Sequence, residues 1–248
     1  MFASFKMLAV FLTLGPLCGM VGIPYTAVIG DVTQFYWAVM SIIRMGVHAA
    51  GISVEVTGQQ NVPAGTSCIF LCNHVSNLDP PVVLPVLPGR TVVLLKRSLM
   101  SIPLLGTAMR QAAFIPVDRG SRRDAAQESV RTAALALKAG LHILIFPEGT
   151  RSVDGRLSTF KKGPFFLAAE TGATIIPVAV SGTETMMRKG SASIHPAVAR
   201  VQLLAPIRAE DYASREALMA AVHAAIASAL PDAMKPEAMK PEAIQPVR

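Results

Sequence analysis

Short runs of apolar residues recur along the middle of the chain, separated by polar or glycine-containing segments. Many of these runs are too uniformly apolar for a strand with one wet face, so they predict strands buried on both faces of a sheet. Segments with helical spacing lie between them, and this alternation is typical of an α/β fold with a mixed, largely parallel sheet covered by helices. The expected strands are residues 52–56, 67–72, 91–95, 113–117, 142–146, 174–180 and 199–204.

Two of the helical segments also carry end signals. Residues 121–139 begin at Ser121, a good N-cap residue, and stop before Gly140, where a left-handed residue would close the helix. A last helix is predicted at residues 214–230. These two segments would cover the sheet.

The chain after the last predicted helix is repetitive and rich in proline. Residues 233–243 repeat a five-residue pattern with regular prolines, which prevents a continuous helix and gives little apolar surface to bury. The sequence therefore predicts a core domain of residues 51–231 followed by a disordered tail of residues 232–248.

The N-terminal residues 1–50 form a separate hydrophobic region. No charged residue stands between Lys6 and Asp31, and residues 7–30 are long enough to cross a bilayer at about 1.5 Å per helical residue. Two helical pieces lying in one leaflet and a single span both fit, whereas a signal peptide fits less well because no convincing cleavage site follows. Small or rigid residues predict a break in the first apolar stretch: Gly15, Pro16, Gly19, Gly22 and Pro24.

Composition narrows the classes of function. The 248 residues are 52% hydrophobic, which is enough to bury one large core. The formal charge of +7 indicates a basic surface. Only 6% of the residues are aromatic, so the stacking platforms of nucleic-acid binders are scarce and nucleic acid is not an expected partner. Basic residues concentrate at 96–123, 151–162 and 188–189, which favours phosphorylated substrates or an anionic lipid surface.

The cysteine pattern gives no sign of a metal site. Cys18, Cys68 and Cys72 have no zinc-like spacing, and three cysteines cannot all pair with each other. The sequence therefore favours a reducing compartment and predicts no bound metal.

A histidine and an aspartate follow the second predicted strand. His74 comes directly after the apolar run 68–72, and Asp79 stands five residues later at a plausible helix start. A carboxylate that accepts from one ring nitrogen fixes the tautomer and leaves the other nitrogen as a base. The alternative for these two residues is a capping aspartate and an ordinary core histidine.

A polar turn also follows the fifth predicted strand, at Glu148, Gly149, Thr150 and Arg151. Glycine lets the backbone approach a ligand, and arginine can make a bidentate contact with a phosphate. Glu148 can order either the arginine or a substrate hydroxyl, although a surface turn held by a Glu–Arg pair is the simpler alternative.

Two further strand ends carry basic residues. Lys96 ends the third strand, where it can join Arg151 around a phosphate, and Asp118 and Arg119 follow the fourth strand. Backbone donors near the Asn73–His74 strand end, or the side chains of Asn73 and Ser76, are candidates for stabilising an oxyanion.

In these blocks the chain resembles the 1-acyl-sn-glycerol-3-phosphate acyltransferases, or lysophosphatidate acyltransferases, of the glycerolipid acyltransferase group. The His-x4-Asp block of that family is similar to residues 73–79, and its Phe-Pro-Glu-Gly-Thr-Arg-Ser block is present whole at residues 146–152. A third block resembles residues 114–119, and a Pro-Val segment matches Pro177–Val178. The resemblance extends over roughly residues 51–207.

The resemblance implies roles for these residues. His74 would be the general base and Asp79 its orienting partner, with an acyl group delivered as a thioester of acyl carrier protein or coenzyme A and no metal, cofactor or acyl-enzyme. Residues that would bind the phosphate of a lysophospholipid acceptor or line its site are Lys96, Arg119, Glu148, Gly149, Thr150 and Arg151. It also implies an N-terminal helix pair in one leaflet, here at the cytoplasmic face of a bacterial inner membrane.

Other functions remain open on the sequence alone. The same chemistry can act on another lysolipid such as lyso-ornithine lipid, and a hydrolase could use His74 with water on a thioester or ester. Against a serine hydrolase, the chain has no Gly-x-Ser-x-Gly elbow. A lipid-binding protein without activity is disfavoured because His74, Asp79, Glu148 and Arg151 are all present.

Overall fold

The computed structural model describes residues 2–117, 123–187 and 190–236. In this part of the chain seven strands form one sheet, in the order β1-β7-β6-β2-β5-β3-β4, and all neighbouring pairs are parallel except β6 and β7. The predicted mixed, largely parallel sheet is confirmed. The strands are β1 Ser53–Thr57, β2 Cys68–Cys72, β3 Thr91–Lys96, β4 Ile115–Val117, β5 His142–Ile145, β6 Thr174–Ser181 and β7 Val198–Leu203.

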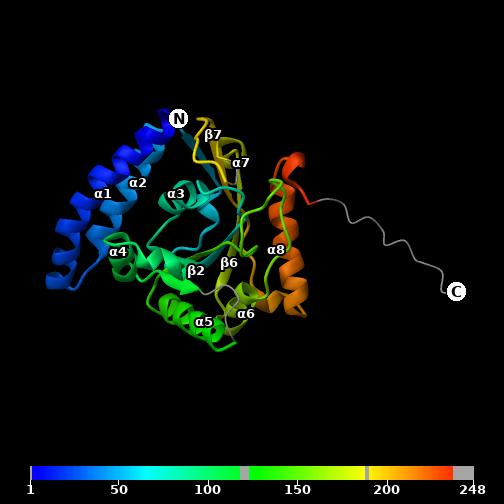
Figure 1. The fold of residues 1–248 in the computed structure, drawn as a ribbon. Helices are drawn as coiled ribbons and strands as arrows, with labels where there is room; N and C mark the ends of the chain where they lie inside the picture. Colours follow the sequence, from blue (N-terminus) through cyan, green and yellow to red (C-terminus); the bar gives the residue numbers. More distant parts are fainter. Residues whose placement is uncertain (1, 118–122, 188–189, 237–248) are drawn as a thin grey trace.

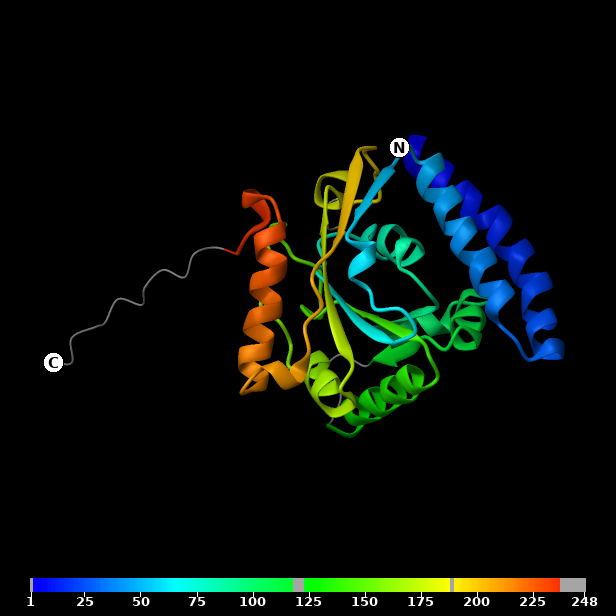
Figure 2. The same cartoon turned by 180° about the vertical axis from the view of Figure 1, so that it is seen from behind.

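Helices cover both faces of the sheet (Figures 1 and 2). The helices of the domain are α3 Asp79–Val83, α4 Leu105–Gln111, α5 Arg123–Lys138, α6 Gly163–Thr171, α7 Thr183–Met186 and α8 Arg215–Ala229. The helices predicted at 121–139 and 214–230 are α5 and α8. Ser214 caps α8 by accepting from Ala217 N at 3.1 Å, whereas the proposed cap Ser121 lies outside the described residues.

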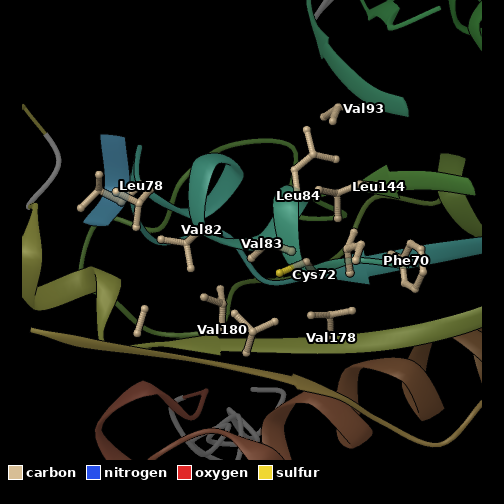
Figure 3. Close-up of a cluster of buried hydrophobic side chains, with 14 of the residues drawn as sticks. Phe70, Cys72, Leu78, Val82, Val83, Leu84, Val93, Leu144, Val178 and Val180 are labelled. Carbon is tan, nitrogen blue, oxygen red and sulfur yellow. The ribbon is translucent and has the colours of Figure 1, made fainter. Parts of the chain in front are cut away.

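The central strand β2 shows why the sheet is buried on both sides. Phe70 and Cys72 pack into a cluster with α2, α3 and β6, whereas Ile69 and Leu71, which point to the other face, pack with α5, α6 and α8. Figure 3 shows the first cluster, in which side chains of β2 and β6 meet those of α3 and the turn after it. The uniformly apolar sequence of β2 follows from this double burial.

An N-terminal pair of helices, α1 Phe2–Ile29 and α2 Thr33–Ala49, packs side by side against this domain (Figure 1). Among the described residues α1 is the one helix long and apolar enough to cross a bilayer. Gly30, with φ +75°, ends α1, and Asp31 Oδ1 accepts from Thr33 N at 2.8 Å where α2 begins.

The predicted break inside the first apolar stretch is wrong. Helix α1 runs on through Pro16 and Pro24, and the chain turns only at residues 30–32. Each proline removes one backbone hydrogen bond but already has a helical φ, so the rest of the helix continues on both sides of it.

Helix α2 is fixed to the sheet through a buried tyrosine. Tyr36 Oη donates to Thr91 O at 3.1 Å and accepts from Thr91 N at 3.0 Å, at the first residue of β3. Tyr36 is 3% exposed. The helix pair is therefore attached to the domain by a specific polar contact as well as by apolar packing.

At the other end of the chain, packing extends past α8. Met234 lies in the short 3₁₀ helix η5 Asp232–Met234, is buried, and accepts from Leu157 N through its carbonyl at 2.8 Å. Residues 237–248 of the predicted tail lie outside the described residues.

Asn73 extends the sheet beyond the end of β2. Its Nδ2 donates to Val180 O at 2.9 Å and its Oδ1 accepts from Val180 N at 2.8 Å, so a side chain completes the pairing with β6. Both residues are fully buried. A buried backbone group left without a partner costs free energy, so this amide holds the strand end that precedes His74.

We predict that Asn73→Ala lowers the free energy of unfolding by about 2–4 kcal/mol, because it leaves the buried N–H and C=O of Val180 unpaired. Chemical unfolding of the protein in detergent measures the difference. Asn77→Ala, at an exposed position nearby, is the matched control and should change stability by no more than about 0.5 kcal/mol. Equal stabilities for the two variants would contradict the assigned role.

Candidate active site

The two main polar turns meet because their strands are neighbours. Strands β2 and β5 pair in parallel, with Leu71 opposite Ile145, so the segments that leave their carboxyl ends lie at the same edge of the sheet. His74 leaves β2 and Glu148 leaves β5 at this edge. Ligand sites of α/β proteins gather at such edges.

His74 and Asp79 form the predicted pair, with Nδ1 of His74 2.8 Å from Oδ2 of Asp79. The same Oδ2 accepts from Val75 N at 2.7 Å and from Ser76 N at 2.8 Å. The other oxygen, Oδ1, accepts from Thr183 Oγ1 at 2.6 Å. Asp79 is fully buried, and its carboxylate accepts hydrogen bonds from these four donors.

These contacts fix the tautomer of the imidazole. Because the carboxylate of Asp79 is the acceptor, Nδ1 of His74 carries the proton and Nε2 keeps its lone pair. The aspartate also accepts from the backbone of the 75–76 turn, but it is not the cap of α3, whose N-cap residue is Leu78 and has no side-chain cap hydrogen bond. The histidine is not an ordinary core residue, since its side chain is 12% exposed and lines a cavity.

The backbone of His74 is held on both sides by the turn after β5. His74 N donates to Glu148 Oε1 at 2.7 Å, and His74 O accepts from Ser152 N at 2.9 Å. The imidazole stacks on the ring of Phe146, with 4.2 Å between centroids. The orientation of the imidazole thus depends on residues about 70 positions away in the sequence.

Glu148 holds the turn together from inside. Its second oxygen, Oε2, accepts from Ser158 N at 3.0 Å, and Glu148 is only 2% exposed. Burial raises the pKa of Glu148 to about 7, against the lowering effect of the two backbone N–H donors. The next residue, Gly149, has φ +72°, a conformation that favours glycine.

A cavity of about 1440 Å³ opens beside this turn. It runs between the sheet edge and the helix pair, so apolar residues of α1 and α2 line one part of it, including Phe11, Leu12, Val39 and Ile43. The polar part brings together most of the residues singled out in the sequence: His74, Lys96, Glu148, Gly149, Thr150 and Arg151. Asp79 lies buried behind His74, and Arg119 lies outside the described residues.

The expected oxyanion donors are already engaged. The Asn73 amide binds Val180, and Ser76 Oγ donates to Met187 O at 2.9 Å. The backbone N–H groups of residues 74–76 donate to Glu148 and Asp79. These groups therefore support the turn and are not directed into the cavity as open donors for an oxyanion.

Three residues of the site were missed in the sequence. Thr183 contacts Asp79, Phe146 stacks on His74, and Ser158 binds Glu148. Thr183 stands shortly after the Pro177–Val178 block, which was the available signal, but spacing does not show which carboxylate it reaches.

No group of three or more metal-binding side chains is clustered within the described ranges. The expectation that the chain needs no metal stays a prediction.

Comparison with known proteins gives several relatives named 1-acyl-sn-glycerol-3-phosphate acyltransferase. The chain is 34% identical over 195 residues to a 1-acyl-sn-glycerol-3-phosphate acyltransferase of Cocos nucifera, covering 77% of this chain and 62% of that protein. It is 35% identical over 147 residues to a protein of the same name from Borreliella burgdorferi, covering 59% and 58% of the two chains. This chain thus spans less than two thirds of the length of either relative.

The fold has a counterpart among solved structures. The 1-acyl-sn-glycerophosphate acyltransferase PlsC from Thermotoga maritima superposes with a TM-score of 0.77, covering 92% of this chain and 94% of that chain at 22% identity. At this identity the likeness shows a shared fold.

The family model named Acyltransferase matches residues 53–181, which is just over half of the chain and includes both turns of the site. The chain therefore belongs to the acyltransferase family.

Proposed function

We propose that this protein transfers a fatty acyl group from a thioester to the sn-2 hydroxyl of 1-acyl-sn-glycerol-3-phosphate, giving phosphatidate. The contact between His74 Nδ1 and Asp79 Oδ2 carries this proposal, because His74 lines a large, partly apolar cavity. Family membership and the names of the relatives support it.

The proposed mechanism uses His74 as a general base. Its Nε2 takes the proton of the acceptor hydroxyl as the oxygen attacks the thioester carbonyl, and Asp79 stabilises the imidazolium that forms. The tetrahedral intermediate then collapses, the carbon–sulfur bond breaks, and the thiolate leaves with the proton returned from His74. No covalent bond to the protein is formed, because a thioester is already an activated acyl donor.

The basic residues at the cavity suit a phosphorylated acceptor. Lys96 and Arg151 both line it, and an arginine binds phosphate oxygens in a bidentate manner. The apolar part of the cavity suits acyl chains. Acyl carrier protein and coenzyme A are both proposed as carriers of the donor, since basic residues attract either.

The proposed location is the cytoplasmic face of a bacterial inner membrane, with α1 and α2 lying in one leaflet. Helix α1 exposes many large apolar side chains, which supports contact with lipid.

The first prediction from this proposed function tests the reaction itself. Purified protein in detergent should release thiol from acyl-coenzyme A or acyl carrier protein only with lysophosphatidate present, and should yield phosphatidate. His74→Ala should lower the rate by about 10²–10⁴-fold because the base is removed. The exposed His195→Ala is the matched control and should retain activity.

Other outcomes of this assay would each overturn part of the proposal. Thiol release without an acceptor would indicate a hydrolase, and release that requires lyso-ornithine lipid would change the acceptor. Full activity of His74→Ala would exclude His74 as the base.

A second prediction concerns Thr183, which we propose positions Asp79. Thr183→Val keeps the shape but removes the hydroxyl, so kcat should fall about tenfold or more with little change in the KM of the acceptor. Thr183→Ser should recover most of the rate. Equal losses in both variants, or none in the valine variant, would argue against a role through the hydrogen bond.

A third prediction follows from the raised pKa of Glu148. Because this pKa of about 7 lies above the ordinary value of 4.5, the folded state binds an extra proton between these pH values, and stability is lost as the pH rises through 7. Relative to Glu148→Gln, the wild-type protein should lose on the order of 3 kcal/mol of unfolding free energy between pH 4.5 and 8.

Chemical unfolding at several pH values measures this difference. Glu170→Gln, at an exposed glutamate, is the control and should follow the wild-type curve. A constant offset between wild type and Glu148→Gln across the pH range would show that Glu148 does not titrate there.

A further inference from the structure

The segment between β3 and β4 exposes large apolar side chains beside the helix pair. Leu99 lies in the 3₁₀ helix η3 Arg97–Ser101, Ile102 follows it, and Leu105 begins α4. Their exposed fractions are 39%, 43% and 44%. Scattered apolar residues are normal on a surface, but three within seven positions make a patch, here called the η3–α4 edge.

This edge adjoins helix α1. Thr26 Oγ1 donates to Gln111 Oε1 at 2.8 Å, and Gln111 Nε2 donates to Ile23 O at 3.3 Å. Gly19 allows close approach, since a Cβ there would lie 2.8 Å from a methyl carbon of Leu104. Both ribbon views place α4 against the helix pair (Figures 1 and 2).

Helix α1 itself has an exposed apolar surface. Its exposed side chains include Leu12, Leu17, Met20, Val21 and Tyr25. Because α4 is bonded to this helix at residues 23–26, the η3–α4 edge continues an apolar surface that begins on α1.

The charge around the edge is basic. Lys96 and Arg97 precede it, Arg110 follows it, and all three are exposed. No acidic residue occurs between positions 91 and 117. Apolar side chains bordered by basic ones match the acyl boundary and the anionic head groups of a lipid leaflet.

We propose that the η3–α4 edge inserts into an anionic lipid leaflet, so that the catalytic domain has a membrane contact of its own in addition to α1 and α2. The proposal rests on the proposed function only in placing α1 against lipid. All three residues of the edge also line the large cavity. The cavity would then open at the level of the lipid, where both a lysolipid and an acyl chain are found.

Fluorescence quenching tests the contact directly. Trp37 is the single tryptophan, so Trp37→Phe gives a background into which Ile102→Trp is introduced. The variant is reconstituted into phosphatidylcholine vesicles that contain phosphatidylglycerol, with and without bromine on the acyl chains. The matched control is Leu135→Trp in the same background, at an exposed leucine of α5.

The indole at position 102 should emit at shorter wavelength and lose about half of its intensity to the bromines, as expected for insertion of about 5–10 Å. The indole at position 135 should show neither change. Leu99→Trp provides a second probe if Ile102→Trp fails to fold, and circular dichroism shows which variants are folded.

Three results would overturn the proposal. Protein that floats with the vesicles while positions 99 and 102 behave like position 135 is bound through α1 without the edge. Protein that does not float lacks the lipid contact altogether. Tryptophan emission that is not quenched by the brominated lipids but shifts in wavelength when acyl carrier protein is added would assign the edge to a protein partner. The quenching experiment contains no substrate. A negative result in the detergent assay of acyl transfer would therefore contradict the proposed function and leave the test of the η3–α4 edge unaffected.

Discussion

The buried carboxylate of Asp79 is the contact on which the site depends. It accepts from an imidazole, two backbone N–H groups and a threonine hydroxyl, which come from the turn after β2 and from α7. A buried carboxylate is costly without such partners. The same interactions that make its burial possible also set the tautomer of His74, so the stability of the turn and the tautomer of the imidazole have one origin.

A second set of contacts orients the imidazole of His74. Glu148 and Ser152 bind the N–H and C=O of His74, Phe146 stacks on its ring, and Asn73 joins the strand end to β6. The parallel pairing of β2 with β5 brings these segments together. The helix pair then closes the far side of the cavity, and Tyr36 fixes its position against β3. The apolar and polar parts of the cavity are therefore supplied by different regions of the chain.

The sequence predicted much of this arrangement where the signal is local. All seven strands were placed. Strands such as β2 are apolar throughout because both faces are buried, whereas β1 and β7 show an alternation of burial along the strand. His74, Glu148 and Arg151 were found because they follow buried strands. Contacts between distant segments were not predicted: nothing in the spacing joins Thr183 to Asp79 or Asn73 to Val180. The continuity of α1 through Pro16 and Pro24 was missed because helix propensity weighs each residue alone and does not register the packing of α1 along α2.

The two hydrogen bonds that hold the backbone of His74 to Glu148 and Ser152 affect which insertions the chain can accept. The turns at residues 73–79 and 146–152 are coupled by direct hydrogen bonds and by adjacent strands, and not by the length of chain between them. Segments inserted or exchanged within the intervening residues, on the side away from this edge, would leave the two turns in register. This freedom is confined to the loops at the opposite edge of the sheet, because in the intervening chain β3 pairs with β5 and Lys96 lines the cavity.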